Sequence, residues 1–182
     1  MSRIREIRVL PLRCKIKGRS SIVGGPGEFL CCLVQVSTDT GLTGLGEVQL
    51  GARFPRLVVS MVDQVKNLVV GQDPWDRRRL WDKMYRAIYS WGRRGLPIGV
   101  LGAIEIALWD ICGKEAGVPV YDLLGGAARE AVPVYASGGL EQCARTIAEE
   151  AAAYVEEGYR AVKIRLFQRE WYENFELAQA AR

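Results

Sequence analysis

The 182-residue chain is predicted to fold as an α+β domain followed by two βα units of a parallel sheet. Two observations support this prediction. Strand-like runs with one tight turn open the chain and three helical stretches follow them, whereas strand and helix patterns alternate after Gly125-Gly126. Strands followed by helices indicate an α+β domain, and consecutive βα units indicate a parallel sheet.

The first domain is expected to contain an antiparallel meander. We predict strands at residues 3–12, 29–37 and 42–48, with the tight turn at Asp39-Thr40-Gly41. Residues 15–27 carry four glycines and one proline, and they are predicted to form a long mobile loop. A second loop is expected at residues 50–55.

Three helices are expected next. The first covers residues 57–69, and the second begins at Asp73-Pro74, an N-cap carboxylate followed by proline at the first helical position, and runs to about Trp91. The third covers residues 102–116 and is apolar on nearly all of its faces, which predicts that it is buried. Asp110 and Lys114 are expected to pair, and Gly117 to end the helix. Pro119 is expected to prevent the helix from restarting immediately.

The aromatic residues of the second helix are predicted to lie in the core: Trp75, Trp81, Tyr85 and Trp91.

After Gly126 the pattern alternates. Strands are predicted at 132–136 and 159–166, and helices at 141–157 and 170–182. We therefore predict domains at residues 1–125 and 126–182. A sheet of two parallel strands cannot bury both of its faces, so the second domain is expected to be the start of a larger α/β domain.

Composition excludes several classes of function. A net charge of +4 without a long basic run disfavours nucleic-acid binding, and no uninterrupted apolar run approaches the ~18 residues of a membrane span. Five cysteines without a CxxC pair favour reduced thiols and a cytoplasmic location over disulfides or zinc. The chain contains no histidine, which excludes Ser-His, Cys-His and His-metal chemistry within it.

Candidate site residues lie where the parallel strands end. Ser137 follows the first strand, and Lys163 and Arg165 share one face of the second. Two cations there would attract an anionic substrate, and the alternative is that both point outward or pair with acids such as Glu157. Arg19 and Ser20 in the first loop and Arg53 in the second are further candidates for substrate contact, although an ordinary surface loop explains them equally well.

One stretch carries a family resemblance. It comprises Gly102-Ala103-Ile104-Glu105, Ala107-Leu108-Trp109-Asp110-Ile111, Gly113-Lys114, Pro119-Val120 and Leu123-Leu124-Gly125. This run resembles the N-terminal signature of the mandelate racemase/muconate lactonizing enzyme family of the enolase superfamily. The resemblance implies an N-terminal capping domain, whose loops match residues 15–27 and 50–55, followed by the first two βα units of a modified TIM barrel. It also implies a homo-oligomer.

The resemblance further implies a chemistry. Family members bind Mg²⁺, which stabilises the enediolate formed when a base removes the proton α to a carboxylate. No metal ligand is expected in this chain, since the ligands come from the third, fourth and fifth barrel strands. Lys163 and Arg165 match the family's Lys-x-Lys and are the predicted catalytic residues, with Lys163 near the carboxylate of a small hydroxy-carboxylic acid substrate.

Arg165 departs from the family pattern. A guanidinium is a poor general base, so Arg165 is expected to bind and polarise a carboxylate or hydroxyl, although a base role stays open. This favours an acid-sugar dehydratase over a racemase, an epimerase or a cycloisomerase. The alternative from another class is a catalytically incomplete chain acting as a structural or interaction module. The 182 residues alone are expected to be inactive, because a barrel needs ~200 residues.

Overall fold

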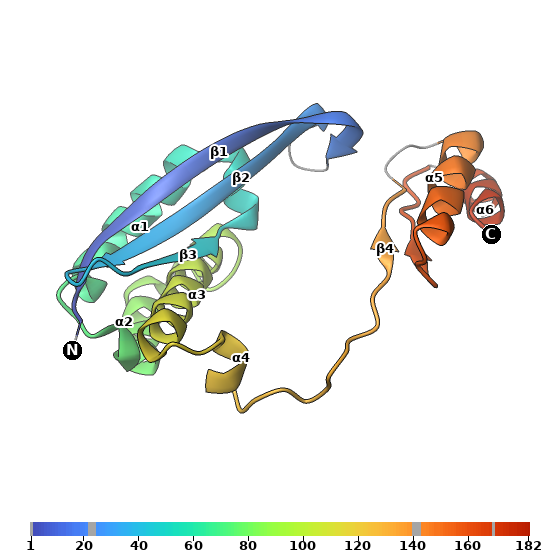
Figure 1. Cartoon of the computed structure of the whole chain (residues 1–182). Helices are drawn as coiled ribbons and strands as arrows, with labels where there is room; N and C mark the ends of the chain where they lie inside the picture. The colour runs from blue at the N-terminus through green and yellow to red at the C-terminus, as the bar shows by residue number, and fades with distance from the viewer. Residues whose placement is uncertain (1, 22–24, 140–142, 169) are drawn as a thin grey trace. The chain divides into compact units, whose positions relative to one another are not determined.

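The computed structural model describes residues 2–21, 25–139, 143–168 and 170–182, with side chains left out of the description at 17–21 and at 25–26. Figure 1 shows the order of the elements along the chain. The chain divides into two compact units: Met1–Ile16 with Glu28–Ala127, and Lys17–Gly27 with Ala128–Arg182. Each unit is described by itself below.

The chain begins with a three-stranded sheet of order β1-β2-β3 (Figure 1). The strands are β1 (Ile4–Ser21), β2 (Gly25–Thr38) and β3 (Thr43–Glu47), and β2 pairs antiparallel with β3 with Val34 opposite Gly46. The tight turn is confirmed, because Thr38 N–H donates to Leu42 O at 2.9 Å and Gly41 has a φ of 86°.

The loop predicted at residues 15–27 is wrong for most of its length. β1 continues to Ser21 and β2 starts at Gly25, while residues 22–24 lie outside the described part. Pairing in a hairpin satisfies the backbone groups of both segments whatever their side chains, so a ladder tolerates glycines that read as loop in a sequence. The second predicted loop contains the 3₁₀ helix η1 (Gln49–Arg53).

The helices follow in the predicted order: α1 (Pro55–Val69), η2 (Pro74–Asp76), α2 (Arg77–Ile88), α3 (Leu96–Ala116) and α4 (Val120–Leu123). Asp73 accepts from Trp75 N–H at 2.9 Å as the predicted N-cap, and Gly117 ends α3 in the left-handed conformation with a φ of 68°. The expectation for Pro119 was wrong. Proline is tolerated at a helix start because no intrahelical partner exists there for the missing N–H, and α4 begins at the next residue.

Strand β3 lies against helix α3 at backbone contact. A Cβ at Gly44 would stand 2.0 Å from Ala107 O, and a Cβ at Gly46 would stand 2.0 Å from Ala103 O. The predicted pair of Asp110 and Lys114 is confirmed at 2.8 Å.

The same two side chains of α3 also reach the backbone of β3. Asp110 Oδ2 accepts from Leu45 N–H at 3.1 Å, and Lys114 Nζ donates to Thr43 O at 2.7 Å. The ion pair therefore joins α3 to the edge strand of the sheet, where backbone groups would otherwise be unpaired.

Helix α3 is the centre of the apolar core. It is long and apolar enough to cross a bilayer by length and composition, yet Val100, Ile104, Ala107 and Leu108 are fully buried against the sheet and the other helices. A helix that is apolar all round is buried in protein when such a core surrounds it.

The aromatic residues of the second helix divide into two groups. Trp81 and Tyr85 pack against the core as predicted. Trp75 and Trp91 do not, since they are 43% and 55% exposed. The Trp75 indole N–H donates to Glu115 Oε2 at 2.5 Å, so this side chain is held by a hydrogen bond at the surface and not by burial in the core.

The second unit contains β4 (Ala136–Ser137), α5 (Ala144–Glu156), β5 (Val162–Lys163) and α6 (Trp171–Ala180). The predicted parallel pairing is confirmed, with Ala136 opposite Val162. Both strands are shorter than predicted. In the first, Val132 and Val134 lie in exposed chain outside the ladder. Residues become strand only where a neighbour supplies ladder hydrogen bonds.

Replacing Gly46 with alanine tests the contact between β3 and α3. The added Cβ would overlap Ala103 O, so we expect a loss of about 3 kcal/mol of unfolding free energy, the upper part of the range for overpacking. Chemical denaturation of the chain measures it. Gly102→Ala on α3 is the control: its Cβ meets nothing within 4 Å and should stabilise the helix by up to ~1 kcal/mol. Equal stability of Gly46→Ala and wild type would contradict the close contact.

Candidate functional site

The candidate site lies at the carboxyl ends of β4 and β5. Ser137 and Lys163 are direct partners in the parallel ladder, and both are exposed. Residues paired in this way project from the same face of a sheet. The structure therefore brings these two candidates together, and their roles stay predictions.

Arg165 joins this pair through the backbone of the first strand. Its Nη1 donates to Gly138 O at 3.3 Å, and the N–H of the same glycine donates to Lys163 O at 2.9 Å. Gly138 follows Ser137 directly, so one residue connects the three candidates. A hydroxyl, an ammonium and a guanidinium at the end of parallel strands suit an anionic, oxygen-rich ligand.

The remaining candidates lie elsewhere. Arg53 is exposed at the end of η1 in the first unit, beside Phe54, which is 54% exposed. Arg19 and Ser20 belong to β1 by backbone, and their side chains lie outside the described part. Their placement relative to Lys163 and Arg165 stays a prediction.

Sequence reasoning missed Glu150. This half-buried residue of α5 accepts from Gly139 N–H at 2.9 Å through Oε2 and from the Tyr154 hydroxyl at 3.0 Å through Oε1. Its carboxylate thus holds the backbone directly after the strand end. A glutamate four residues before a tyrosine on a helix face was the available signal, but ordinary surface pairs share it.

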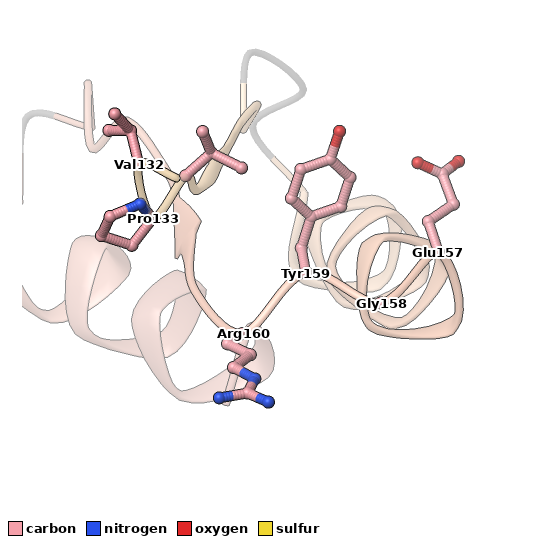
Figure 2. A pocket seen from close by; sticks show the side chains of 7 residues that line it. Val132, Pro133, Glu157, Gly158, Tyr159 and Arg160 are labelled. Atoms are coloured by element: carbon pink, nitrogen blue, oxygen red, sulfur yellow. The ribbon is translucent and has the colours of Figure 1, made fainter. Parts of the chain in front are cut away.

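An open hollow of about 710 Å³ lies at the opposite ends of the two strands (Figure 2). It is lined by Val132, Pro133, Val134, Glu157, Gly158, Tyr159 and Arg160. Glu157 and Arg160 point away from each other in Figure 2. Glu157, the acid considered as a partner for the cations, therefore belongs to this end.

No metal centre is formed by the part of the chain that the structure describes, since no group of three or more Cys, Asp or Glu side chains there could hold an ion. Its residues do not by themselves fit Mg²⁺, which prefers a near-octahedral set of oxygen ligands. The site at the strand ends is cationic.

The five cysteines are free thiols with contrasting environments. Burial raises the pKa of Cys112, opposed in part by Arg77, and burial together with Glu47 raises the pKa of Cys31 and Cys32. Cys143 is exposed at the start of α5. The backbone N–H groups of Thr146 and Arg145 lower the pKa of its thiol.

Comparison with known proteins shows which protein family shares this sequence and architecture. Residues 19–125 match the sequence profile described as the N-terminal domain of mandelate racemase / muconate lactonizing enzyme. A solved structure of an enolase superfamily member from Polaromonas sp. JS666 is 30% identical, with a TM-score of 0.81 over 99% of this chain and 48% of its own. The 3,6-anhydro-D-galactonate cycloisomerase from Zobellia galactanivorans is 26% identical, with a TM-score of 0.81 over 100% of this chain and 48% of its own.

The fold is thus that of an enolase-superfamily protein with its N-terminal capping domain. The profile match covers more than half of the chain, and the chain belongs to the mandelate racemase/muconate lactonizing enzyme family. The D-galactonate dehydratase family member RspA of Halomonas elongata is 39% identical over 153 residues, and D-mannonate dehydratase CC0532 of Caulobacter vibrioides is 39% identical over 152 residues. Each alignment covers 82% of this chain and 36% of the relative, so the chain spans about a third of their length.

The thiol environments predict an order of alkylation. At pH 7 we expect iodoacetamide to modify Cys143 at least about tenfold faster than the fully buried Cys32 and Cys112, because the thiolate is the reactive form. Peptide mass spectrometry over time measures the rates. Unfolding in urea should bring the rates of the five thiols close together. Modification of Cys112 in the folded chain as fast as Cys143 would contradict the expectation.

Proposed function

We propose that this chain supplies the capping domain (residues 1–125) and the first two barrel units (126–182) of an Mg²⁺-dependent acid-sugar dehydratase. The carrying observation is the convergence of Ser137, Lys163 and Arg165 at the carboxyl ends of β4 and β5. The dehydratase names of the two curated relatives support the substrate class. The reaction is removal of the proton α to a carboxylate followed by loss of a hydroxyl.

The proposed roles follow from charge and geometry. The exposed ammonium of Lys163 attracts the substrate carboxylate, and the Arg165 guanidinium binds and polarises a carboxylate or hydroxyl oxygen. Negative charge grows on the carboxylate as the α-proton leaves, so fixed cations there favour the transition state. Mg²⁺ held by further barrel strands would supply additional stabilisation of this charge. Ser137 offers a hydroxyl on the same face as Lys163.

The capping domain is proposed to select the substrate. Arg53, exposed at the end of η1, and the β1–β2 hairpin that carries Arg19 and Ser20 are its candidate contacts. We further propose a cytoplasmic homo-oligomer acting on a small hydroxy-carboxylic acid. The likeness to the Zobellia cycloisomerase favours one competing function, an isomerisation that begins with the same proton abstraction.

Substitution of the two cations tests this proposal in a full-length protein with a whole barrel. Turnover of a panel of mono- and diacid sugars with Mg²⁺ is measured first. Lys163→Ala and Arg165→Lys should then each lower kcat/KM by about 10- to 100-fold, because an ammonium cannot replace the planar fork of a guanidinium and lost positioning is costly.

Arg160→Lys is the matched control, since Arg160 lines the hollow at the opposite ends of the strands. It should leave turnover unchanged. Wild-type turnover of an acid sugar without loss of water would favour the isomerase, and full activity of both cation variants would refute the assigned roles. The 182 residues alone should show no turnover.

A further inference from the structure

A half-buried carboxylate in the second unit has no part in the roles assigned above. Glu150 lies in the middle of α5, and each of its two oxygens has its own donor: Gly139 N–H at 2.9 Å and the Tyr154 hydroxyl at 3.0 Å. Tyr154 is only 7% exposed, and its ring stands edge-on to Tyr159 at 6.0 Å. Two separate donors fix the orientation of the carboxylate.

The backbone after β4 is shaped to receive this carboxylate. A Cβ at Gly138 would stand 2.5 Å from Glu150 Oε1 and 3.0 Å from the Tyr154 ring. Gly139 has a φ of 71°, and a Cβ there would stand 2.8 Å from Ile164 Cα. An added Cβ at Gly139 would overlap backbone at a left-handed φ, whereas one at Gly138 would push aside the end of the Glu150 side chain and press on the Tyr154 ring. The Glu150 carboxylate therefore lies closer to Gly138 than a side chain at that position would allow.

The same glycine backbone holds both cationic strand residues. Gly138 N–H donates to Lys163 O at 2.9 Å, and Gly138 O accepts from Arg165 Nη1 at 3.3 Å. Hydrogen bonds thus run from Glu150 through the Gly138-Gly139 backbone to the two residues proposed to bind the substrate. Residues that bind a substrate need supporting hydrogen bonds that hold their side chains in the productive geometry.

We infer that Glu150 is a positioning residue for the substrate-binding cations. Its carboxylate, oriented by Tyr154, fixes Gly138-Gly139, and this backbone holds the Arg165 guanidinium and the end of β5 in register. This assignment rests on the proposed function for its kinetic consequences, whereas its structural consequence is independent of any activity.

Glu149 offers a matched comparison on the same helix. It is a glutamate one residue away, its side chain is 66% exposed, and its ion pair with Arg145 is long at 3.9 Å. Removing it takes away the same kind of charge from α5 without touching the strand end. A general effect of helix charge would therefore appear in both variants, and a positioning effect only at Glu150.

The first test needs no substrate. In the 182-residue chain, Glu150→Ala should speed amide hydrogen exchange at Gly139 by about tenfold or more and shift the Arg165 guanidinium NMR signal, because the Gly139 donor loses its acceptor. Glu149→Ala should change neither. Unaltered exchange at Gly139 in Glu150→Ala overturns the inference. This outcome does not depend on the proposed function, because it can be measured even if the wild-type protein turns over no acid sugar.

The second test separates positioning from stability. In the full-length enzyme, well below its Tm, Glu150→Ala should lower kcat per folded molecule about tenfold with KM changed less than about threefold. Glu150→Gln retains an oxygen for Gly139 N–H and should recover most of kcat. Gly138→Ala would displace the carboxylate and should add little to Glu150→Ala in the double variant. A lowered Tm with wild-type kcat in Glu150→Ala would show a structural role only and overturn the inference.

Discussion

The close approach of β3 to α3 is the constraint on which the first unit depends. Two glycines on one face of β3 allow the strand backbone to meet the carbonyl groups of α3, and any side chain at Gly44 or Gly46 would separate them. Asp110 and Lys114 then bind the backbone of the same strand. Steric fit and polar pairing thus act at one interface, and a half-exposed ion pair that would contribute little alone gains a defined structural use. These two charged residues of a largely apolar helix stabilise the sheet edge.

A related solution appears in the second unit on a smaller scale. Glycines again permit a close approach, here between the end of β4 and the carboxylate of Glu150. The consequence differs, because Gly138 also bonds to Lys163 and Arg165. The Gly138-Gly139 backbone is held by Glu150 of α5, and the same backbone bonds to the two cationic residues at the end of β5. This arrangement links a small core, with Tyr154 at its edge, to the surface where a substrate anion is proposed to bind.

Much of the fold was readable because the responsible signals are local. The N-cap at Asp73, the left-handed Gly117 and the turn ending at Gly41 each depend on neighbouring residues, and each is confirmed. Several errors arose where a residue depends on a partner in another element. The Gly-containing end of β1 is strand because β2 runs beside it, and the exposed Trp75 has the partner of its indole N–H in Glu115, forty residues later. Lys163 and Arg165 became candidates from spacing and resemblance, whereas Glu150 did not, since its partner Gly139 is defined only by the folded chain.

By itself the sequence determined the order of strands and helices, the caps, the apolar character of α3 and the family. These follow from periodicity, turn chemistry and a run of constrained residues, all of which are properties of neighbours along the chain. Only the tertiary structure decided which strand lies against α3, how far the hairpin extends and which carboxylate holds the end of β4. The physical reason is that sheet pairing, close backbone contact and half-buried hydrogen bonds join residues far apart in sequence, and their energies depend on distances that no local pattern encodes.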